Sequence, residues 1–200
     1  MKLTAIKKQI NSKHRFSIYV DNKYSFSLGE IEILKNGIKI GQELSPEELK
    51  GLKQISAQDK LYARTLKLVA ARPKSEWEVT NYLSQKDASP ALIKDILNKL
   101  SELGLIDDYK FAEMYIRDIT HHSPASRRKI LSKLKQKRVK EEAIEQALQG
   151  IAGNDQSALD KLIETKHRKY PDKMKLMAYL SRQGFSYPDI KSALDNLEDD

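Results

Sequence analysis

Three stretches of this 200-residue chain follow one pattern: Tyr82-Leu83-Ser84-Gln85-Lys86, Lys133-Leu134-Lys135-Gln136-Lys137 and Tyr179-Leu180-Ser181-Arg182-Gln183. In each stretch the leucine is followed ten residues later by isoleucine and fourteen residues later by a second leucine. The isoleucines are Ile93, Ile144 and Ile190, and the second leucines are Leu97, Leu148 and Leu194. Leucine and isoleucine at this spacing also occur by chance in helical proteins, but a threefold coincidence favours an internal repeat.

Each copy also has an upstream alanine, 20 to 22 residues before its leucine: Ala63, Ala112 and Ala158. Successive copies are offset by 51 and 46 residues, which suits a unit of three helices with loops of variable length. We therefore expect about nine repeat helices. Because one such unit is too small to bury its own apolar face, the copies should stack into an elongated, curved array.

Local signals place several helix ends. Serine followed by glutamate at the third position beyond it predicts a capping box at Ser45-Pro46-Glu47-Glu48 and at Ser75-Glu76-Trp77-Glu78. Ser89-Pro90 and Ser186-Tyr187-Pro188 open the third helix of copies one and three. Gly104 and Gly150 are placed as C-terminal stops.

The first 45 residues have a different pattern. Apolar residues alternate over 16–20 and again over 24–28, with Asp21-Asn22-Lys23 between them, which predicts a β-hairpin. A strand over residues 3–10 could pair with it. The segment from Glu30 to Lys35 is compatible with a short helix stopped by Gly37 or with a further strand.

The chain is thus predicted to be mainly α-helical, with three tandem three-helix repeats after a small N-terminal domain that contains a β-hairpin. The expected divisions are 1–56, 57–106, 107–153 and 154–200. Their net charges are +4, +2, +3 and −1. The overall charge of +8 favours a polyanionic partner, because lysine and arginine release counterions when they face phosphates.

Composition limits the other possibilities. The chain has no cysteine, which excludes disulfides, thiolate zinc sites and thiol nucleophiles. It has no apolar run near 18 residues and a mean hydropathy of −0.62, so we expect a cytoplasmic protein that does not enter a membrane.

Catalytic candidates are few. Asp107-Asp108 could be a carboxylate pair, but an aspartate after Gly104-Leu105-Ile106 is more typical of a helix N-cap. His121-His122 could bind a metal, yet no further ligand follows at helical spacing, and a solvated helix end explains it better. Nucleotide-binding and nucleophile motifs are missing. We expect a binding protein rather than an enzyme, with no cofactor and no metal.

Basic residues form two clusters. The first cluster has eight cations within fourteen residues: Arg127, Arg128, Lys129, Lys133, Lys135, Lys137, Arg138 and Lys140. On a helix starting near Pro124, Ile130, Leu131 and Leu134 would be buried, and Arg127, Arg128, Lys135 and Arg138 would share the outer face. The second cluster comprises Lys166, Arg168, Lys169, Lys173 and Lys175, with Tyr170 among them. Stacked repeats would bring the clusters together as a polyanion-binding surface, although the alternative is an ordinary solvated face. Trp77, two residues after a predicted helix cap, is expected to pack in the core or at its rim rather than to stack on a nucleic-acid base.

The stretch Leu103-Gly104-Leu105-Ile106-Asp107-Asp108-Tyr109-Lys110-Phe111-Ala112-Glu113-Met114-Tyr115 resembles the signature of the RecX regulators of bacterial recombination. Arg72, Ser75, Leu83 and the segment from Ile93 to Leu100 resemble the part before it, and the likeness extends over residues 57–197. The chain departs from the family pattern at Ser123-Pro124 and at Lys137-Arg138-Val139, where many members have glycine.

This resemblance implies a non-enzymatic modulator that binds the RecA filament on single-stranded DNA, limits its activity and damps the SOS response. The basic clusters would then face DNA phosphates or acidic filament surface, and the protein would act as a monomer. A different class of function remains open: a direct DNA-binding protein that acts without a recombinase, on single-stranded or double-stranded DNA. Such a protein should show sequence preference and a steep salt dependence.

Overall fold

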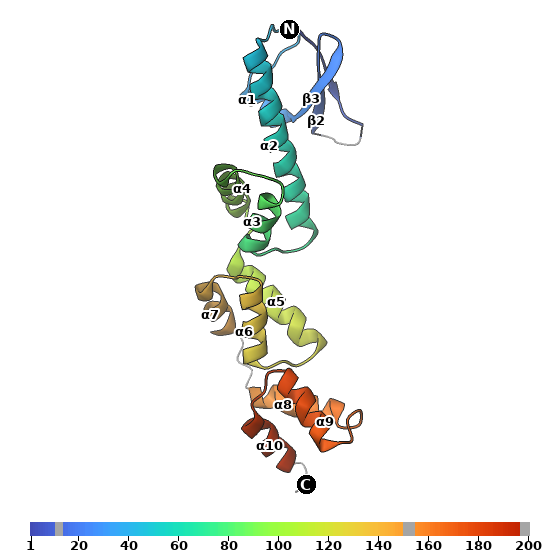
Figure 1. Ribbon diagram of the computed structural model, residues 1–200, viewed down its shortest axis with the longest axis vertical. Coiled ribbons are helices and arrows are strands. Elements are labelled where there is room, and N and C mark those ends of the chain that lie inside the picture. Colours follow the sequence, from blue (N-terminus) through green and yellow to red (C-terminus); the bar gives the residue numbers. More distant parts are fainter. Residues whose placement is uncertain (11–13, 150–154, 197–200) are drawn as a thin grey trace. The chain divides into compact units, whose positions relative to one another are not determined.

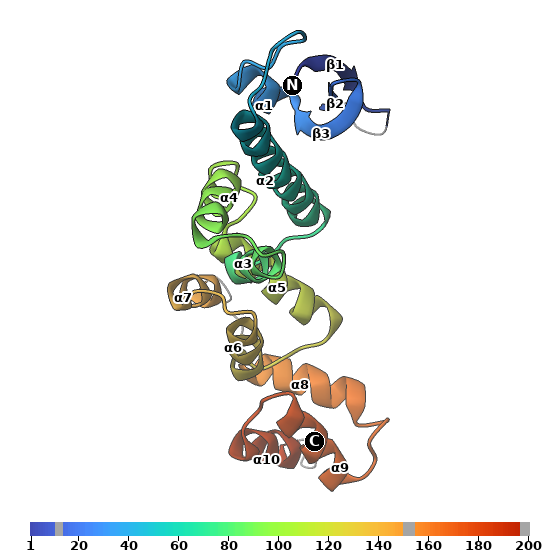
Figure 2. The same cartoon turned by 45° about the horizontal axis from the view of Figure 1, so that its top comes forward.

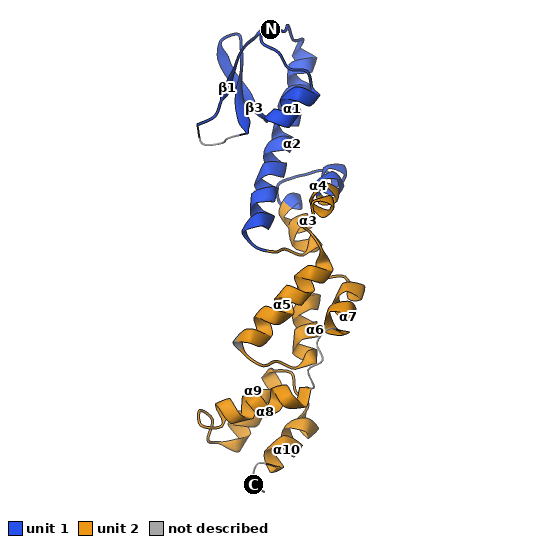
Figure 3. Ribbon diagram, turned by 180° about the vertical axis from the view of Figure 1, so that it is seen from behind, with its two compact units in different colours: residues 1–72, 83–96 blue, residues 73–82, 97–200 orange. Residues whose placement is uncertain are grey.

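Three strands and ten helices follow one another in the computed structural model, which describes residues 1–10, 14–149 and 155–196 (Figure 1). The elements are β1 (Leu3–Lys8), β2 (Arg15–Val20), β3 (Lys23–Gly29), α1 (Glu30–Lys35), α2 (Pro46–Ala71), α3 (Glu76–Ser84), α4 (Pro90–Glu102), α5 (Asp108–His122), α6 (Arg127–Gln136), α7 (Glu141–Gln149), α8 (Asp155–Lys166), α9 (Lys173–Arg182) and α10 (Tyr187–Asp195). The predicted mainly helical fold with a small N-terminal sheet is confirmed. The chain forms two compact units, 1–72 with 83–96 and 73–82 with 97–200 (Figure 3).

The N-terminal sheet is antiparallel, in the order β1-β2-β3. Asp21 and Asn22 connect β2 to β3 and both have positive φ, 48° and 61°, as a tight hairpin turn requires. One face of the sheet is buried against α2, which lies beside it with α1 (Figure 2). Asp59 of α2 fixes this contact, because its carboxylate accepts the Gly29 N–H at 2.9 Å and pairs with Arg15 at 2.9 Å. The predicted hairpin and first strand are confirmed.

The segment that the sequence left open between helix and strand contains α1. Its C-cap residue is Asn36, and Gly37 follows with φ 58°, a conformation that suits glycine. The helical alternative is therefore correct.

Helix α2 begins with the predicted capping box, in which Ser45 and Glu48 bond each other's backbone N–H, at 3.1 and 2.7 Å. It continues for 26 residues, because no proline or glycine interrupts residues 52–72. The helix expected at Ser45 and the first repeat helix are thus one helix, and eight helices, not nine, follow α2 in the described parts of the chain. The expected division after residue 56 lies inside α2.

The second and third copies each enclose an apolar core. Leu134, Ile144 and Leu148 belong to the core of α5–α7, and Leu180, Ile190 and Leu194 have the same places in the core of α8–α10. All six are no more than 6% exposed, as the repeat predicts. Ile130 is also buried as expected, whereas Leu131 is half-buried.

Helix ends match most of the local signals. Ser75 and Glu78 form a capping box, Ser89 Oγ accepts from Leu92 N at 3.3 Å, and Ser186 caps α10. Gly104 ends α4 with φ 66°. One expectation is wrong: α6 begins at Arg127 with Ser126 as its N-cap, later than the expected start near Pro124. Gly150 lies outside the described residues.

Candidate interaction surface

The same turn follows the repeated leucine in all three copies. The fourth residue after the leucine has positive φ in each: Asp87 (57°), Arg138 (50°) and Gly184 (94°). The fifth residue donates its N–H back to the leucine carbonyl, at 3.2, 3.3 and 3.4 Å in turn. This is the hydrogen bonding of a left-handed helix C-cap. The departure from the family's glycine at Arg138 therefore leaves the turn intact.

The N-cap serine of one repeat binds the turn of the next. Ser75 Oγ donates to the Lys137 carbonyl at 3.0 Å, and Ser126 Oγ donates to the Gln183 carbonyl at 3.0 Å. Both serines are fully buried. Each serine stands eight residues before its repeat leucine, so the two joints are equivalent. In the third copy this position is Asp172, which caps α9 and cannot donate when ionised.

A carboxylate at the start of the next repeat completes each joint. Asp108 accepts the Glu76 N–H at 2.9 Å and the Lys140 N–H at 3.3 Å, and Asp155 accepts the Arg127 N–H at 2.8 Å. Free N–H groups at a helix start carry a partial positive charge, so a carboxylate stabilises them. Asp108 thus has a structural role in the joint, while Asp107 is the predicted N-cap, accepting from Tyr109 and Lys110.

Two ion pairs strengthen the first joint. Lys137 Nζ lies 2.8 Å from Glu78, and Lys140 Nζ lies 2.6 Å from Glu76. Burial alone would raise the pKa of Glu78, but hydrogen bonds from Lys137 and the Ser75 N–H, with the charges of Lys137 and Lys74, outweigh it and lower the pKa. The hydrogen bond to Glu76 raises the pKa of Lys140. Both lysines therefore form ion pairs between the first and second repeats.

The second joint has a different pair at the equivalent places: Lys129 stands where the first joint has Glu78, and the uncharged Gln183 stands where it has Lys137. Lys129 Nζ donates to the side-chain amide oxygen of Gln183. Burial lowers the pKa of Lys129, and the neighbouring charge of Lys133 acts in the same direction. Gly184 lies so close that an added Cβ would overlap Ser126 Oγ and stand 3.1 Å from Lys129 Cβ. Glycine is required here by space as well as by φ.

The first basic cluster is consequently divided between two roles. Lys129, Lys137 and Lys140 hold the joints, and Lys135 pairs with Glu141 at 2.9 Å. The remaining members are exposed and form no ion pair with any described residue: Arg127, Arg128, Lys133 and Arg138. We call the exposed face formed by Arg128, Lys135 and Arg138 the α6 strip; a shallow groove lined by Arg128, Leu131, Ser132, Lys135 and Gln136 follows it.

The two basic clusters do not meet in this structure. The first cluster contacts the third repeat at Asp155, the first residue of α8, and at Gln183, which follows the last residue of α9. The second cluster lies at the other ends of these helices, since Lys166 ends α8 and Lys173 begins α9. Helices of twelve and ten residues are about 18 and 15 Å long, so α8 and α9 separate the two clusters. Lys173 pairs with Asp195 at 3.3 Å, and Lys169 lies 5.9 Å from the Tyr170 ring centroid. Lys166 is half-buried, whereas Arg168 and Lys175 are exposed.

Trp77 lies at the first joint and is 38% exposed, so the expectation that its ring is packed is not confirmed. The guanidinium carbon of Arg138 lies 5.6 Å from the centroid of its ring, within the range of a cation–π contact. The contact joins α3 of one repeat to the turn of the next.

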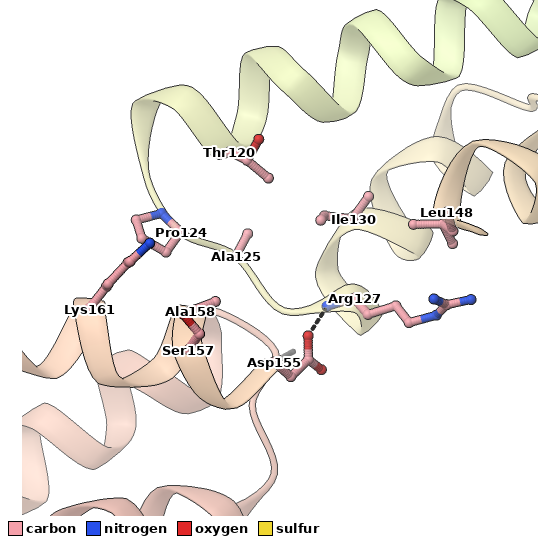
Figure 4. Close-up of a pocket in the computed structure, with 10 residues that line it drawn as sticks. All are labelled: Thr120, Pro124, Ala125, Arg127, Ile130, Leu148, Asp155, Ser157, Ala158 and Lys161. Carbon is pink, nitrogen blue, oxygen red and sulfur yellow. Dashed lines mark hydrogen bonds between the residues drawn. The ribbon is translucent and has the colours of Figure 1, made fainter. Parts of the chain in front are cut away.

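A pocket opens at the second joint, between the α5–α6 loop and α8 (Figure 4). Its apolar lining includes Ala125, Ile130 and Leu148. The Asp155 carboxylate, which also lines the pocket, accepts a hydrogen bond from the Arg127 N–H. The exposed Arg127 side chain lines the same pocket and extends toward the side where Leu148 lies (Figure 4).

The described residues contain no group of three or more histidine and acidic side chains that could hold a metal ion. His121 is exposed at the end of α5. Within the same residues, none of the helices is both long and apolar enough to cross a membrane.

Family models match four successive regions of the chain. They are the regulatory protein RecX N-terminal domain over residues 1–45, and the first, second and third RecX three-helix domains over residues 62–100, 107–148 and 154–194. The chain belongs to the RecX family. The tandem three-helix repeats inferred from the leucine pattern are the three RecX domains.

Relatives named regulatory protein RecX support this membership. Regulatory protein RecX of Bacillus subtilis is 26% identical over 203 residues, covering 98% of this chain and 77% of the relative. The Clostridium tetani protein of the same name is 29% identical over 98% of this chain and 94% of its own length. A crystal structure of regulatory protein RecX aligns with a TM-score of 0.75 over 97% of this chain and 98% of the other, at 26% identity. RecX from Lactobacillus salivarius aligns over 70% and 96%, with a TM-score of 0.60 and 26% identity.

The relatives are named as regulatory proteins, which agrees with the expectation of a non-enzyme. Sequence reasoning missed the joint residues Ser75, Ser126, Asp108 and Asp155. A signal for the serines was present, because both stand eight residues before the repeat leucine. Their partners are 57 or 62 residues away, a pairing that local patterns do not contain.

Proposed function

We propose that this RecX protein binds the RecA filament on single-stranded DNA and lowers its recombinase and ATPase activity, as a monomer in the cytoplasm, in DNA repair and the SOS response. The observation that carries the proposal is the match of all four regions to RecX models, with relatives named as regulatory proteins. A regulator of this kind needs a binding surface and no catalytic centre.

The basic residues of the second repeat support contact with a polyanion. Arg127, Arg128 and Lys133 are exposed without an ion pair among the described residues, so a phosphate or an acidic side chain can bind them without displacing a partner. We place the main contact there and give Lys129, Lys137 and Lys140 a supporting role, because they also hold the joints. Lys166, Arg168, Lys169, Lys173 and Lys175 would form a second, separate contact.

A filament assay tests this function. RecA-dependent ATP hydrolysis and strand exchange on single-stranded DNA are measured with increasing amounts of the protein. Inhibition should appear at amounts well below those that coat the DNA. Inhibition only at DNA-saturating amounts would contradict the proposal, because competition for DNA would then explain it.

Direct DNA binding without a recombinase is the second candidate, and the net charge of +8 favours it. This second hypothesis predicts that the protein binds DNA tightly without RecA, with a steep salt dependence and a preference for certain sequences. Measuring affinity for single-stranded and double-stranded oligonucleotides at several salt concentrations, without RecA, separates the two functions.

A further inference from the structure

Arg138 occupies a position where its backbone favours glycine. It has φ 50°, and the equivalent residues are Gly184 in the third repeat and Asp87, with φ 57°, in the first. A left-handed conformation is unfavourable for a non-glycine residue, because its Cβ lies too close to a backbone carbonyl oxygen. The turn itself needs no side chain at this place, since the third repeat makes the same hydrogen bonds with glycine. The structure therefore points to a use for the arginine side chain.

The visible contact of that side chain is the Trp77 ring, 5.6 Å from the guanidinium carbon. An arginine that rests on an aromatic ring keeps its N–H donors in a fixed fork, which suits bidentate binding of a phosphate. Arg138 is exposed and pairs with no carboxylate in the described part of the chain. Its donors are thus positioned and available.

The α6 strip extends this site along one helix face. Arg128 and Lys135 are seven residues apart on α6, about 10 Å along its axis, and Arg138 follows in the turn. Lys135 pairs with Glu141, but both side chains are more than half exposed, and such a pair is readily exchanged for another anion. The strip presents successive cations with an aromatic ring at one end.

We propose that Arg138, supported by Trp77, binds a phosphate of single-stranded DNA, and that the strand continues along the α6 strip past Lys135 to Arg128. The exposed part of Trp77 is available to a neighbouring base, which only an unpaired strand can offer for stacking. This inference rests on the proposed contact with single-stranded DNA, and it names the residues of that contact.

Arg138→Gly is the discriminating variant, because glycine is the residue best suited to the turn and the substitution removes only the side chain. Its thermal unfolding midpoint should equal or exceed that of the wild type. Lys191→Ala is the matched control: it removes one exposed positive charge from α10, away from the strip.

Binding of a fluorescein-labelled oligothymidine is followed by anisotropy at several salt concentrations, without RecA. Arg138→Gly should weaken binding about tenfold and reduce the salt slope by about 0.7, the value for one phosphate contact with a single strand. Lys191→Ala should leave the slope unchanged. Trp77 is the one tryptophan of the 200-residue sequence, so its fluorescence should change when the oligonucleotide binds to the wild type.

Equal affinities and slopes for Arg138→Gly and Lys191→Ala would overturn the inference, as would a wild type that does not bind the oligonucleotide. Normal oligonucleotide binding by Arg138→Gly with lost inhibition of RecA ATPase would also overturn it, because Arg138 would then face protein. If the wild type fails to inhibit RecA while Arg138→Gly still weakens oligonucleotide binding, the proposed function fails and the phosphate site stands.

Discussion

Replacing Gly184 with alanine should separate the second joint while leaving both neighbouring cores intact. The added methyl group would overlap Ser126 Oγ, so the serine must move away from the turn. That movement would break two hydrogen bonds of Ser126 Oγ, from Lys129 N at 3.1 Å and to the Gln183 carbonyl at 3.0 Å. The methyl group would also be held at φ 94°, outside the range that alanine prefers.

The expected cost can be assembled from these parts. The left-handed conformation contributes about 1–2 kcal/mol for alanine. Loss of the N-cap bond contributes about 1 kcal/mol, and loss of the inter-repeat bond about 1 kcal/mol. Gly184→Ala should therefore lower the free energy of unfolding by about 3–4 kcal/mol.

Urea denaturation followed by circular dichroism measures this cost, and Gly104→Ala is the matched control. Gly104 also has positive φ, 66°, but an added Cβ there would meet nothing within 4 Å, so that variant reports conformational strain alone. Ser126→Ala should cost about 2 kcal/mol. Because Gly184→Ala already breaks the same two bonds, the double variant should cost about 2 kcal/mol less than the sum of the single ones.

Equal destabilisation by Gly184→Ala and Gly104→Ala would refute the contact between the glycine and the serine. Additive costs in the double variant would refute the claim that Ser126 links the two repeats.

Three further predictions concern the second repeat and its joints. Leu134→Ala should lower the free energy of unfolding by about 2–5 kcal/mol in urea denaturation, because Leu134 is fully buried in the core of α5–α7. Glu78 has a lowered pKa, so its contribution is present above the ordinary value of 4.5 and is lost as pH falls through the lowered pKa; the stability difference between wild type and Glu78→Gln should shrink over that range in a pH series. Changing Arg127, Arg128 and Lys135 together to glutamate should leave the melting temperature nearly unchanged and abolish inhibition of RecA ATPase; full inhibition would remove these residues from the mechanism.

Sequence periodicity predicted burial in the second and third copies, but in the first copy Leu83 is buried while Ile93 and Leu97 are only half-buried, and Ile96 and Leu100 are buried instead. Leu134 and Leu180, with the isoleucine and leucine that follow each, are buried where the spacing placed them. Capping signals at Ser45 and Ser75 were equally reliable, since their partners lie three residues away. The continuous α2 was missed because the repeat pattern suggests a new unit at residue 57, whereas no helix-breaking residue occurs there.

The surface was less predictable. Charge density identifies the basic cluster but cannot show which cations already have partners. Lys137 and Lys140 contact glutamates 59 and 64 residues earlier in the chain, and only the folded structure brings them together. Packing between repeats therefore determines which of these cations are left exposed without an ion pair, and it places α8 and α9 between the two basic clusters.

The two joints carry different side-chain pairs at equivalent places, Glu78 with Lys137 and Lys129 with Gln183. Because of this difference, each turn is complementary to the repeat that precedes it in the chain and not to the other repeats. If the second-repeat turn of one molecule docked on the second repeat of another, Lys129 would meet Lys137, and two ammonium groups would repel each other. If the third-repeat turn docked on the first repeat, Glu78 would lose its cation and Trp77 its arginine. These mismatched contacts would disfavour exchange of repeats between molecules.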